Sequence, residues 1–154
     1  MIKKTYMNCL LLTLTFVSTN VLAQSDEADI KHTINSMFDG MRKTDTTLIR
    51  AAFSAVPILQ TVVKNKEGNI IILTESLDSF LISVSKPHTE IYDERISFEL
   101  VKIDAELAIA WTPYKFYVGD NFSHCGVDSY QLVKIDGQWK IQYLVDTRRR
   151  QECK

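Results

Sequence analysis

The second half of the chain alternates β-rich segments with very short turns, and this pattern limits the folds available to the whole chain. Residues 91–101, 107–118, 127–135 and 139–146 are rich in β-branched and aromatic side chains. Turns separate them at 104–106, 119–121 and 136–137, and Asp136-Gly137 is the clearest hairpin signal in the sequence. Strands joined by such short turns pair with antiparallel neighbours. We therefore expect an antiparallel meander from residue 91 onward.

Helical patterns dominate the first half of the chain. Apolar residues recur at helical spacing over 26–43, and residues 44–45 then interrupt the pattern and cap a short second helix that includes Phe53. Pro57 excludes continuation of that second helix. A third helix is predicted over about 76–85.

A hairpin is predicted between the second and third helices. Its strands are 58–63 and 70–73, and residues 67–69 offer the turn. Helices followed by an antiparallel meander indicate the α+β class. No internal repeat or interdomain linker is visible, so residues 24–154 are expected to form a single domain.

Residues 1–23 have the pattern of a cleaved secretory signal. Lys3 and Lys4 provide a positive start, residues 9–17 are mostly apolar, and small side chains precede the expected cleavage at Ala23-Gln24. The apolar run is shorter than the roughly 20 residues needed to span a bilayer. We expect a secreted or periplasmic protein without a stable membrane anchor; the alternative is an N-terminal anchor or a buried helix.

Composition after residue 23 excludes some partners and predicts a disulfide. This part of the chain has 131 residues with 16 basic and 19 acidic side chains, a formal charge of −3. Such a balance argues against nucleic-acid binding. Cys125 and Cys153 are the two cysteines that remain, and an oxidising compartment favours a bond between them. The alternative is two free or intermolecular thiols.

The segment 107–118 is apolar on both faces of the strand it predicts. Ala108, Ala110, Tyr114 and Phe116 share one parity, and Leu107, Ile109 and Trp111 share the other. A sheet with one solvated face would alternate apolar and polar residues. We therefore expect the helices to cover one face and a second subunit to cover the other.

The order of elements and several short motifs resemble the NTF2-like superfamily, most closely its SnoaL-like or lumazine-binding branch. The motifs are Ala110-Trp111-Thr112-Pro113-Tyr114-Lys115-Phe116, His124-Cys125-Gly126-Val127-Asp128, Gly137-Gln138-Trp139-Lys140-Ile141 and Asp146-Thr147-Arg148-Arg149. The resemblance implies a cystatin-like cone, in which three N-terminal helices pack on a curved, mostly antiparallel sheet. It also implies a pocket at the open end and frequent homodimers through the sheet.

His124 and Asp128 are the candidate catalytic residues. On a regular strand they share a face with Tyr130, so an imidazole and a carboxylate approach each other as an acid–base pair. The alternative is a histidine that forms local hydrogen bonds and orders the strand.

Aromatic residues are the candidate ligand contacts. Trp111 and Tyr114 have opposite parities, so only one of them can face a pocket, and Phe116 and Tyr130 are further candidates. The alternative is that these rings belong to the core.

Asp146 and Arg148 share a face at the end of the last strand. Arg148 could hold a carboxylate or another planar anion at the mouth of a pocket. The alternatives are an internal ion pair with Asp146 or Asp128, and a solvated tail over 148–150.

No motif for a metal, a nucleotide cofactor or a serine nucleophile is present, so no cofactor is expected. These patterns favour an exported domain that binds a small, partly apolar molecule. The alternatives are a cofactor-free isomerase, dehydratase or hydrolase, and a structural or partner-binding module. In the enzyme alternative His124 or Asp128 is the base, and Tyr114 or Arg148 stabilises developing negative charge.

Overall fold

The computed structural model describes residues 19–153, with side chains from Asp26 onward. Residues 1–18, most of the predicted secretory signal, lie outside the described residues. None of the helices described over 19–153 is long and apolar enough to cross a membrane.

Three helices form one layer of the molecule. Helix α1 spans Thr19–Lys43, α2 spans Thr46–Ala52 and α3 spans Leu77–Ser85. The second and third helices begin where their caps predict: the Asp45 carboxylate accepts a hydrogen bond from Leu48 N at 2.9 Å, and the Ser76 hydroxyl accepts one from Ser79 N at 3.1 Å. The first helix begins earlier than residue 26 and runs through the predicted cleavage position.

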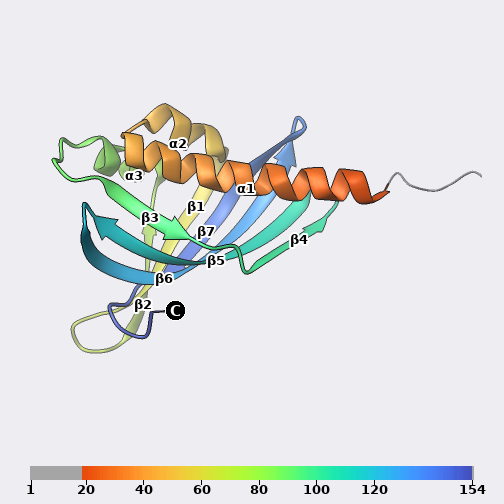
Figure 1. The fold of residues 1–154 in the computed structure, drawn as a ribbon. Coiled ribbons are helices and arrows are strands. Elements are labelled where there is room, and N and C mark those ends of the chain that lie inside the picture. Colours follow the sequence, from red (N-terminus) through yellow and green to blue (C-terminus); the bar gives the residue numbers. More distant parts are fainter. Residues whose placement is uncertain (1–18, 154) are drawn as a thin grey trace, which may run out of the picture.

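A curved seven-stranded sheet forms the other layer, and α1 lies across its concave face (Figure 1). The strands are β1 Phe53–Lys64, β2 Ile70–Glu75, β3 Tyr92–Ile96, β4 Leu100–Asp104, β5 Leu107–Val118, β6 Asn121–Ile135 and β7 Gln138–Thr147. Their order is β2-β1-β7-β6-β5-β3, with β4 also paired to β5. All of these pairings are antiparallel except that of β1 with β7. The predicted α+β class, with helices on a mostly antiparallel sheet, is confirmed.

Pro57 interrupts a strand rather than preceding one, which corrects the prediction for this region. Phe53 is the first residue of β1 instead of the last of the second helix. The register between β1 and β7 shifts between Phe53 and Ile58, so the proline falls where the ladder is already irregular. Proline lacks a backbone N–H and is tolerated at such bulges.

The segment predicted as one strand over 91–101 is two strands, β3 and β4. Both pair with β5, and residues 97–99 between them stay attached through bonds from Ser97 N to the Pro113 carbonyl and from Glu99 N to the Trp111 carbonyl. Pro113 cannot donate a hydrogen bond in return, which explains the break at this point.

Strand β6 begins at Asn121, six residues before the predicted start. It pairs with β5 over almost its whole length. His124 therefore lies within a strand, and the turn before it is tighter than expected.

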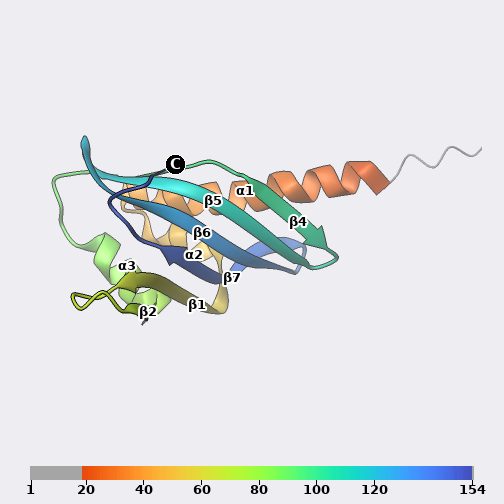
Figure 2. The same cartoon turned by 90° about the horizontal axis from the view of Figure 1, so that it is seen from below.

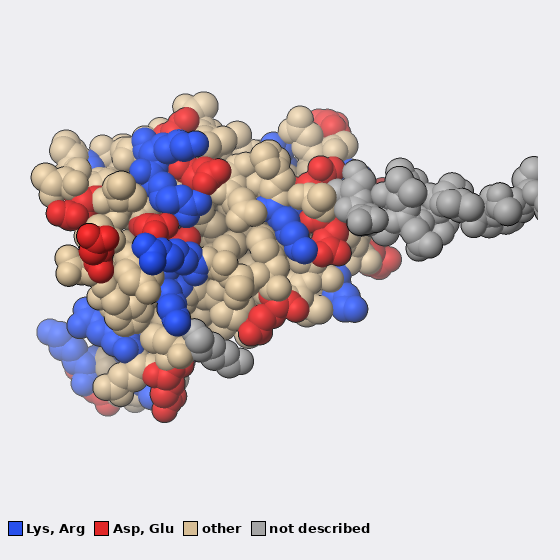
Figure 3. Space-filling view, viewed as in Figure 1, with Lys and Arg blue, Asp and Glu red and all other residues tan. Residues whose placement is uncertain are grey.

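The core lies between α1 and the concave face of the sheet. It contains the apolar stripe of α1 together with inward-facing strand residues, among them Ile30, Ile34, Phe38, Tyr130, Leu132, Trp139 and Ile141. The helices do not cover β4, β5, β6 and β7 on the opposite, convex face of the sheet (Figure 2). Over the face seen in Figure 3, Lys and Arg side chains lie beside Asp and Glu side chains.

Candidate functional site

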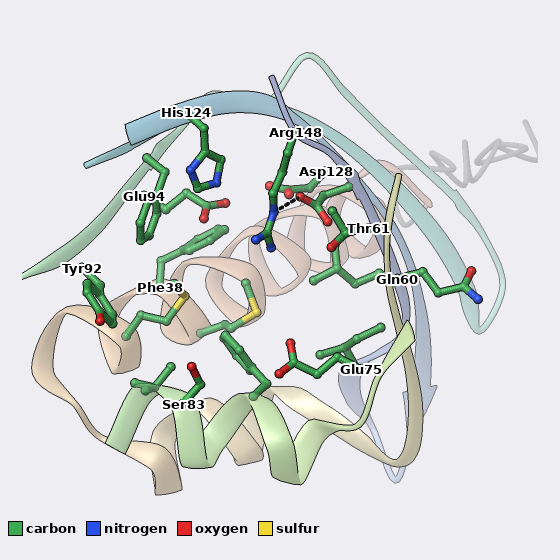
Figure 4. Close-up of a pocket in the computed structure, with 18 of the residues that line it drawn as sticks. Phe38, Gln60, Thr61, Glu75, Ser83, Tyr92, Glu94, His124, Asp128 and Arg148 are labelled. Atoms are coloured by element: carbon green, nitrogen blue, oxygen red, sulfur yellow. Dashed lines mark hydrogen bonds and ion pairs between the residues drawn. The ribbon is translucent and has the colours of Figure 1, made fainter. Parts of the chain in front are cut away.

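A cavity of about 240 Å³ lies between the helices and the concave face of the sheet (Figure 4). Its apolar side comes mainly from α1, α3 and two strands: Met37, Phe38, Met41, Phe80, Val84, Phe116 and Leu144. Its polar side comes mainly from the sheet: Glu94, His124, Asp128, Tyr130, Asp146 and Arg148. The two sides differ in chemistry because the helices present hydrocarbon while the strand ends present charge.

Strand pairing brings two carboxyl groups side by side. Asp128 on β6 is the register partner of Asp146 on β7 and of Thr112 on β5. Paired residues on adjacent strands point to the same face, with Cβ atoms about 5 Å apart. Both aspartates therefore face the cavity.

Asp128 is only 3% exposed, and two neutral hydroxyl groups hold one of its oxygens. Thr112 Oγ1 donates to Asp128 Oδ2 at 3.1 Å, and the Tyr130 hydroxyl donates to the same oxygen at 3.3 Å. Burial and then the negative charge of Asp146 raise the pKa of Asp128 to about 7, against this hydrogen bonding. The carboxyl group therefore titrates near neutral pH.

Glu94 on β3 adds a third carboxyl group, which the sequence analysis missed. Its side chain points into the cavity beneath His124 (Figure 4). Burial, followed by the charges of Asp128 and Asp146, raises the pKa of Glu94 well above its usual range. The carboxyl groups of Glu94 and Asp128 thus each have a pKa raised by burial and by the negative charge of Asp146.

Asp146 pairs with the positive charge at the cavity. Arg148 Nε donates to Asp146 Oδ2 at 3.1 Å, and the Tyr114 hydroxyl contacts the same oxygen at 3.1 Å and the Thr147 carbonyl at 2.9 Å. The Arg148 guanidinium extends into the cavity (Figure 4). Tyr114 thus holds the end of β7 in place from behind the cavity.

Gly126 makes this close approach feasible. A Cβ atom at this position would lie 1.7 Å from the Thr147 carbonyl oxygen and 2.7 Å from a ring carbon of Tyr114. Any larger residue would push the end of β7 away from the Tyr114 hydroxyl.

His124 lies at the rim of the polar side. Its Nδ1 is 3.0 Å from Ser123 Oγ, and its ring lies 4.9 Å from that of Phe116. Burial and then the charge of Arg148 lower the pKa of His124, so the ring is neutral at pH 7.

Comparison with known proteins identifies the fold. No protein-family model matches the sequence, and no curated protein matches it significantly. Solved structures do match: an NTF2-like protein of unknown function from Shewanella baltica superposes with a TM-score of 0.64 at 15% identity, covering 86% of this chain and 98% of that one. An NTF2-like protein of unknown function from Silicibacter pomeroyi also superposes, with a TM-score of 0.64 at 16% identity. The match covers 82% of this chain and 98% of that one.

The chain has an NTF2-like, cystatin-like fold. The β subunit of an aromatic-ring-hydroxylating dioxygenase from Novosphingobium aromaticivorans also superposes, with a TM-score of 0.67 at 10% identity over 82% of this chain and 91% of that one. At such low identities the NTF2-like neighbours establish the architecture alone. The narrower SnoaL-like or lumazine-binding branch stays a prediction.

The NTF2-like cavity brings together six of the eight predicted catalytic and ligand-contacting residues. His124, Asp128, Phe116, Tyr130, Asp146 and Arg148 all line it. Of the alternatives for Arg148, the internal ion pair with Asp146 is present. Among the described residues, the side-chain hydrogen bond of His124 goes to Ser123 rather than to Asp128.

The two remaining candidates lie elsewhere. Trp111 is 43% exposed on the convex face, so its predicted place in the pocket is wrong. The reason is strand parity: Trp111 alternates with the buried Ala110 and Thr112, which take the concave side. Tyr114 is buried behind the cavity and is not one of its lining residues.

The predicted disulfide joins Cys125 to Cys153, whose Cα atoms are 5.8 Å apart. Backbone bonds between Cys125 and Arg149 lie next to it. The tail that carries Arg148 is therefore fixed beside the cavity. Within residues 19–153, no three His, Cys, Asp or Glu side chains are arranged to hold a metal ion.

Proposed function

We propose that this protein is an exported binding protein for a small, partly apolar molecule that occupies the cavity of the NTF2-like domain. The observation that carries the proposal is the division of the cavity into a hydrocarbon side from the helices and a charged side from the sheet. Ligand sites have this composition: mostly apolar walls with a few convergent polar groups that orient the guest. At about 240 Å³ the cavity suits a molecule smaller than most drugs.

Export is supported by two features of the chain. The pattern of residues 1–23 is that of a secretory signal, and a Cys125–Cys153 bond persists only in an oxidising compartment. The mass of the protein recovered from its native host tests this part of the proposal. A chain that starts at Gln24 is expected, and an intact Met1 would contradict export by signal cleavage.

A thermal-shift screen with a matched pair of variants tests the pocket. Ser83 on α3 lines the cavity, whereas Ser85 ends the same helix away from it. Ser83→Phe should fill the cavity and abolish the stabilisation by any hit, while Ser85→Phe should leave it unchanged. A hit whose stabilisation survives Ser83→Phe binds elsewhere and contradicts the proposal.

Cofactor-free acid–base catalysis is a second candidate, favoured by the pKa of Asp128 near 7. A general base works best when its pKa lies near the operating pH. Asp128 would take a proton from the bound molecule, and the Arg148 guanidinium would stabilise the negative charge that develops. Tyr114 is left out of this role, because it is not one of the cavity-lining residues and its hydroxyl bonds to Asp146 and Thr147.

Turnover of a screening hit distinguishes catalysis from binding. Asp128→Asn should remove the turnover while the variant still unfolds cooperatively, and kcat/KM of the unmodified protein should rise with pH around 7. A hit that binds but is not turned over at any pH between 5 and 9 is consistent with the binding function and excludes catalysis on that compound.

We also propose a homodimer through the convex face of the sheet. Leu107, Ile109 and Trp111 of β5 are between 41% and 49% exposed there, and no helix of the described chain covers them. Exposed apolar side chains on one sheet face are typical of a subunit interface.

A further inference from the structure

Carboxyl groups outnumber positively charged groups on the polar side of the cavity. Three carboxyl groups, those of Glu94, Asp128 and Asp146, face one guanidinium, that of Arg148. Asp146 and Arg148 neutralise each other as an ion pair at 3.1 Å. Two carboxyl groups remain, and no ion pair with Lys, Arg or His reaches either of them within residues 19–153.

Apart from Arg148, the titratable groups that line the cavity around this pair supply no positive charge. Arg42 on α1 donates to the backbone carbonyl of Glu94 at 3.3 Å, but its ion pairs are with Asp39 and Asp93. Burial raises the pKa values of Tyr114 and Tyr130, and burial lowers that of His124, so all three are neutral at pH 7. The groups facing the pair from each neighbouring element are Tyr92 on β3, Tyr114 on β5, His124 and Tyr130 on β6, Asp146 on β7 with Arg148 just after it, and Glu75 at the end of β2. Glu75 adds a further negative charge on the α3 side (Figure 4).

We propose that the cavity selects an organic cation, a primary or secondary ammonium on a compact apolar body, whose charge lies between the carboxyl groups of Glu94 and Asp128. This inference rests on the proposed binding function and names its ligand class. An ammonium group supplies a counter-charge to both carboxyl groups and hydrogen-bond donors to Glu94 and to the second oxygen of Asp128. Both of the hydroxyl donors to Asp128 go to Oδ2, which leaves Oδ1 for the ligand.

The apolar side suits the body of such a ligand. Phe38, Phe80 and Phe116 line the cavity with the side chains of Met37 and Met41. Aromatic faces attract an ammonium group, and methionine adapts to irregular hydrocarbon shapes.

Two other ligand classes fit less well. A metal ion needs at least three convergent ligands, and the described residues offer no such group. A carboxylate could bind the Arg148 guanidinium, but it would meet three carboxyl groups and an arginine that Asp146 already neutralises.

Ammonium binding is coupled to proton release from the two carboxyl groups. Burial and the neighbouring negative charges raise the pKa of both groups, so they hold protons near pH 6, and an ammonium placed between them stabilises their charged forms. Affinity should therefore rise with pH from 5 to 7, by up to about tenfold per unit where one proton is released per ligand bound.

Three probes of similar size and different charge test the inference: 2-phenylethylammonium, 2-phenylethanol and 3-phenylpropanoate. Calorimetry of the full mature chain at pH 6, in two buffers of different ionisation enthalpy, gives both affinity and proton release. We expect the ammonium to bind at least tenfold more tightly than the other two, with net release of protons.

Glu94→Gln should weaken ammonium binding at least tenfold and reduce the proton release. Glu99→Gln, an exposed carboxyl group outside the cavity, is the matched control and should change neither. Circular dichroism and thermal unfolding confirm that each variant is folded.

Each remaining outcome overturns the inference. Preferential binding of 3-phenylpropanoate would show an anion site at Arg148, and equal binding of all three probes would show a pocket that does not select charge. Both results would leave the proposed binding function intact. Failure of 2-phenylethylammonium to bind also overturns the ligand class, and the thermal-shift screen then decides the binding function separately.

Discussion

The buried carboxyl group of Asp128 gives the protein a pH-dependent stability of unusual sign. Its pKa is about 7 in the folded protein and 3.8 in the reference state, so the group favours folding below pH 4 and this contribution is lost as pH rises towards 7. Asp128→Asn cannot ionise and should flatten this decline. At pH 7 the variant should be more stable by on the order of 2–4 kcal/mol.

Urea unfolding at pH 4.5 and pH 7.5 measures this effect. Asp120→Asn changes an exposed carboxyl group in the turn before β6 and is the control, with the same pH dependence as the unmodified protein. If Asp128→Asn retains the full decline between the two pH values, the carboxyl group is not the source of it. Stability gained at the cost of binding is typical of functional sites, where an unfavourable group is retained for its chemistry.

Sequence reasoning found the candidate residues that lie on regular strands. His124, Asp128 and Tyr130 were placed on one face by their spacing, and the structure puts all three at the cavity. Glu94 was missed, although it carried a signal: it shares strand parity with Tyr92 and Ile96, whereas Asp93 and Arg95 take the other parity. A charged residue on the apolar parity of a strand is the feature to look for.

Asp26 on α1 connects this helix to strands β6 and β7 of the sheet through hydrogen bonds. Its Oδ1 accepts hydrogen bonds from Lys134 Nζ at 2.5 Å and from Trp139 Nε1 at 3.1 Å, bridging α1 to β6 and β7. Hydrogen bonding from Lys134 and then from Trp139 lowers the pKa of Asp26. The stabilisation is thus present above the unfolded pKa of about 4 and is lost as pH falls below it.

Asp26→Asn should destabilise the protein by about 1 kcal/mol at pH 7, a modest value because the pair is partly exposed to solvent. The difference from the unmodified protein should shrink as the pH falls below 4, as measured by chemical unfolding. Glu27→Gln is the control, because the partner of Glu27 is Lys31 on the same exposed helix face. An equal loss in both variants would indicate a general effect of charge on α1.

The disulfide fixes the C-terminal tail against β6. It closes a loop with a sequence separation of 28 residues, and the chain-entropy model gives about 3–4 kcal/mol for a loop of this length. Cys153→Ser should lower the free energy of unfolding by that amount and make the thermal midpoint insensitive to reducing agent. The unmodified protein under reducing conditions should fall to the same midpoint, and a midpoint unaffected by reduction would contradict the role of the bond.

Elements were predictable where one local signal dominated. Strand β5 and the Asp136-Gly137 turn have the predicted bounds because pattern and turn chemistry agree. The break between β3 and β4 was not predictable from its own residues. It arises from Pro113 on the neighbouring strand, so it depends on a pairing that the sequence of 91–101 does not contain.

At the scale of the whole molecule, the two faces of the sheet have different surroundings. The concave face and the helices enclose the cavity, while the convex face leaves Trp111 and its neighbours exposed. The apolar residues on both parities of 107–118 predicted this difference, because a strand that is apolar on both faces must pack against a partner on each side. The sequence pattern could not predict the shape of the cavity, which depends on side chains from eight separate elements.

The interface that we propose on the convex face predicts that the protein is a dimer at tens of micromolar and that a charge at the centre of this face separates the subunits. Trp111→Lys places an ammonium where two apolar faces would meet, and desolvating that charge without a partner costs several kcal/mol. Sedimentation velocity should therefore show a monomer for Trp111→Lys, with an unchanged circular dichroism spectrum. Ile82→Lys is the matched control, because Ile82 is 61% exposed on α3, on the helical side of the molecule, and this variant should remain a dimer. A monomeric unmodified protein at 100 µM, or dissociation by both substitutions alike, would exclude this face as the interface.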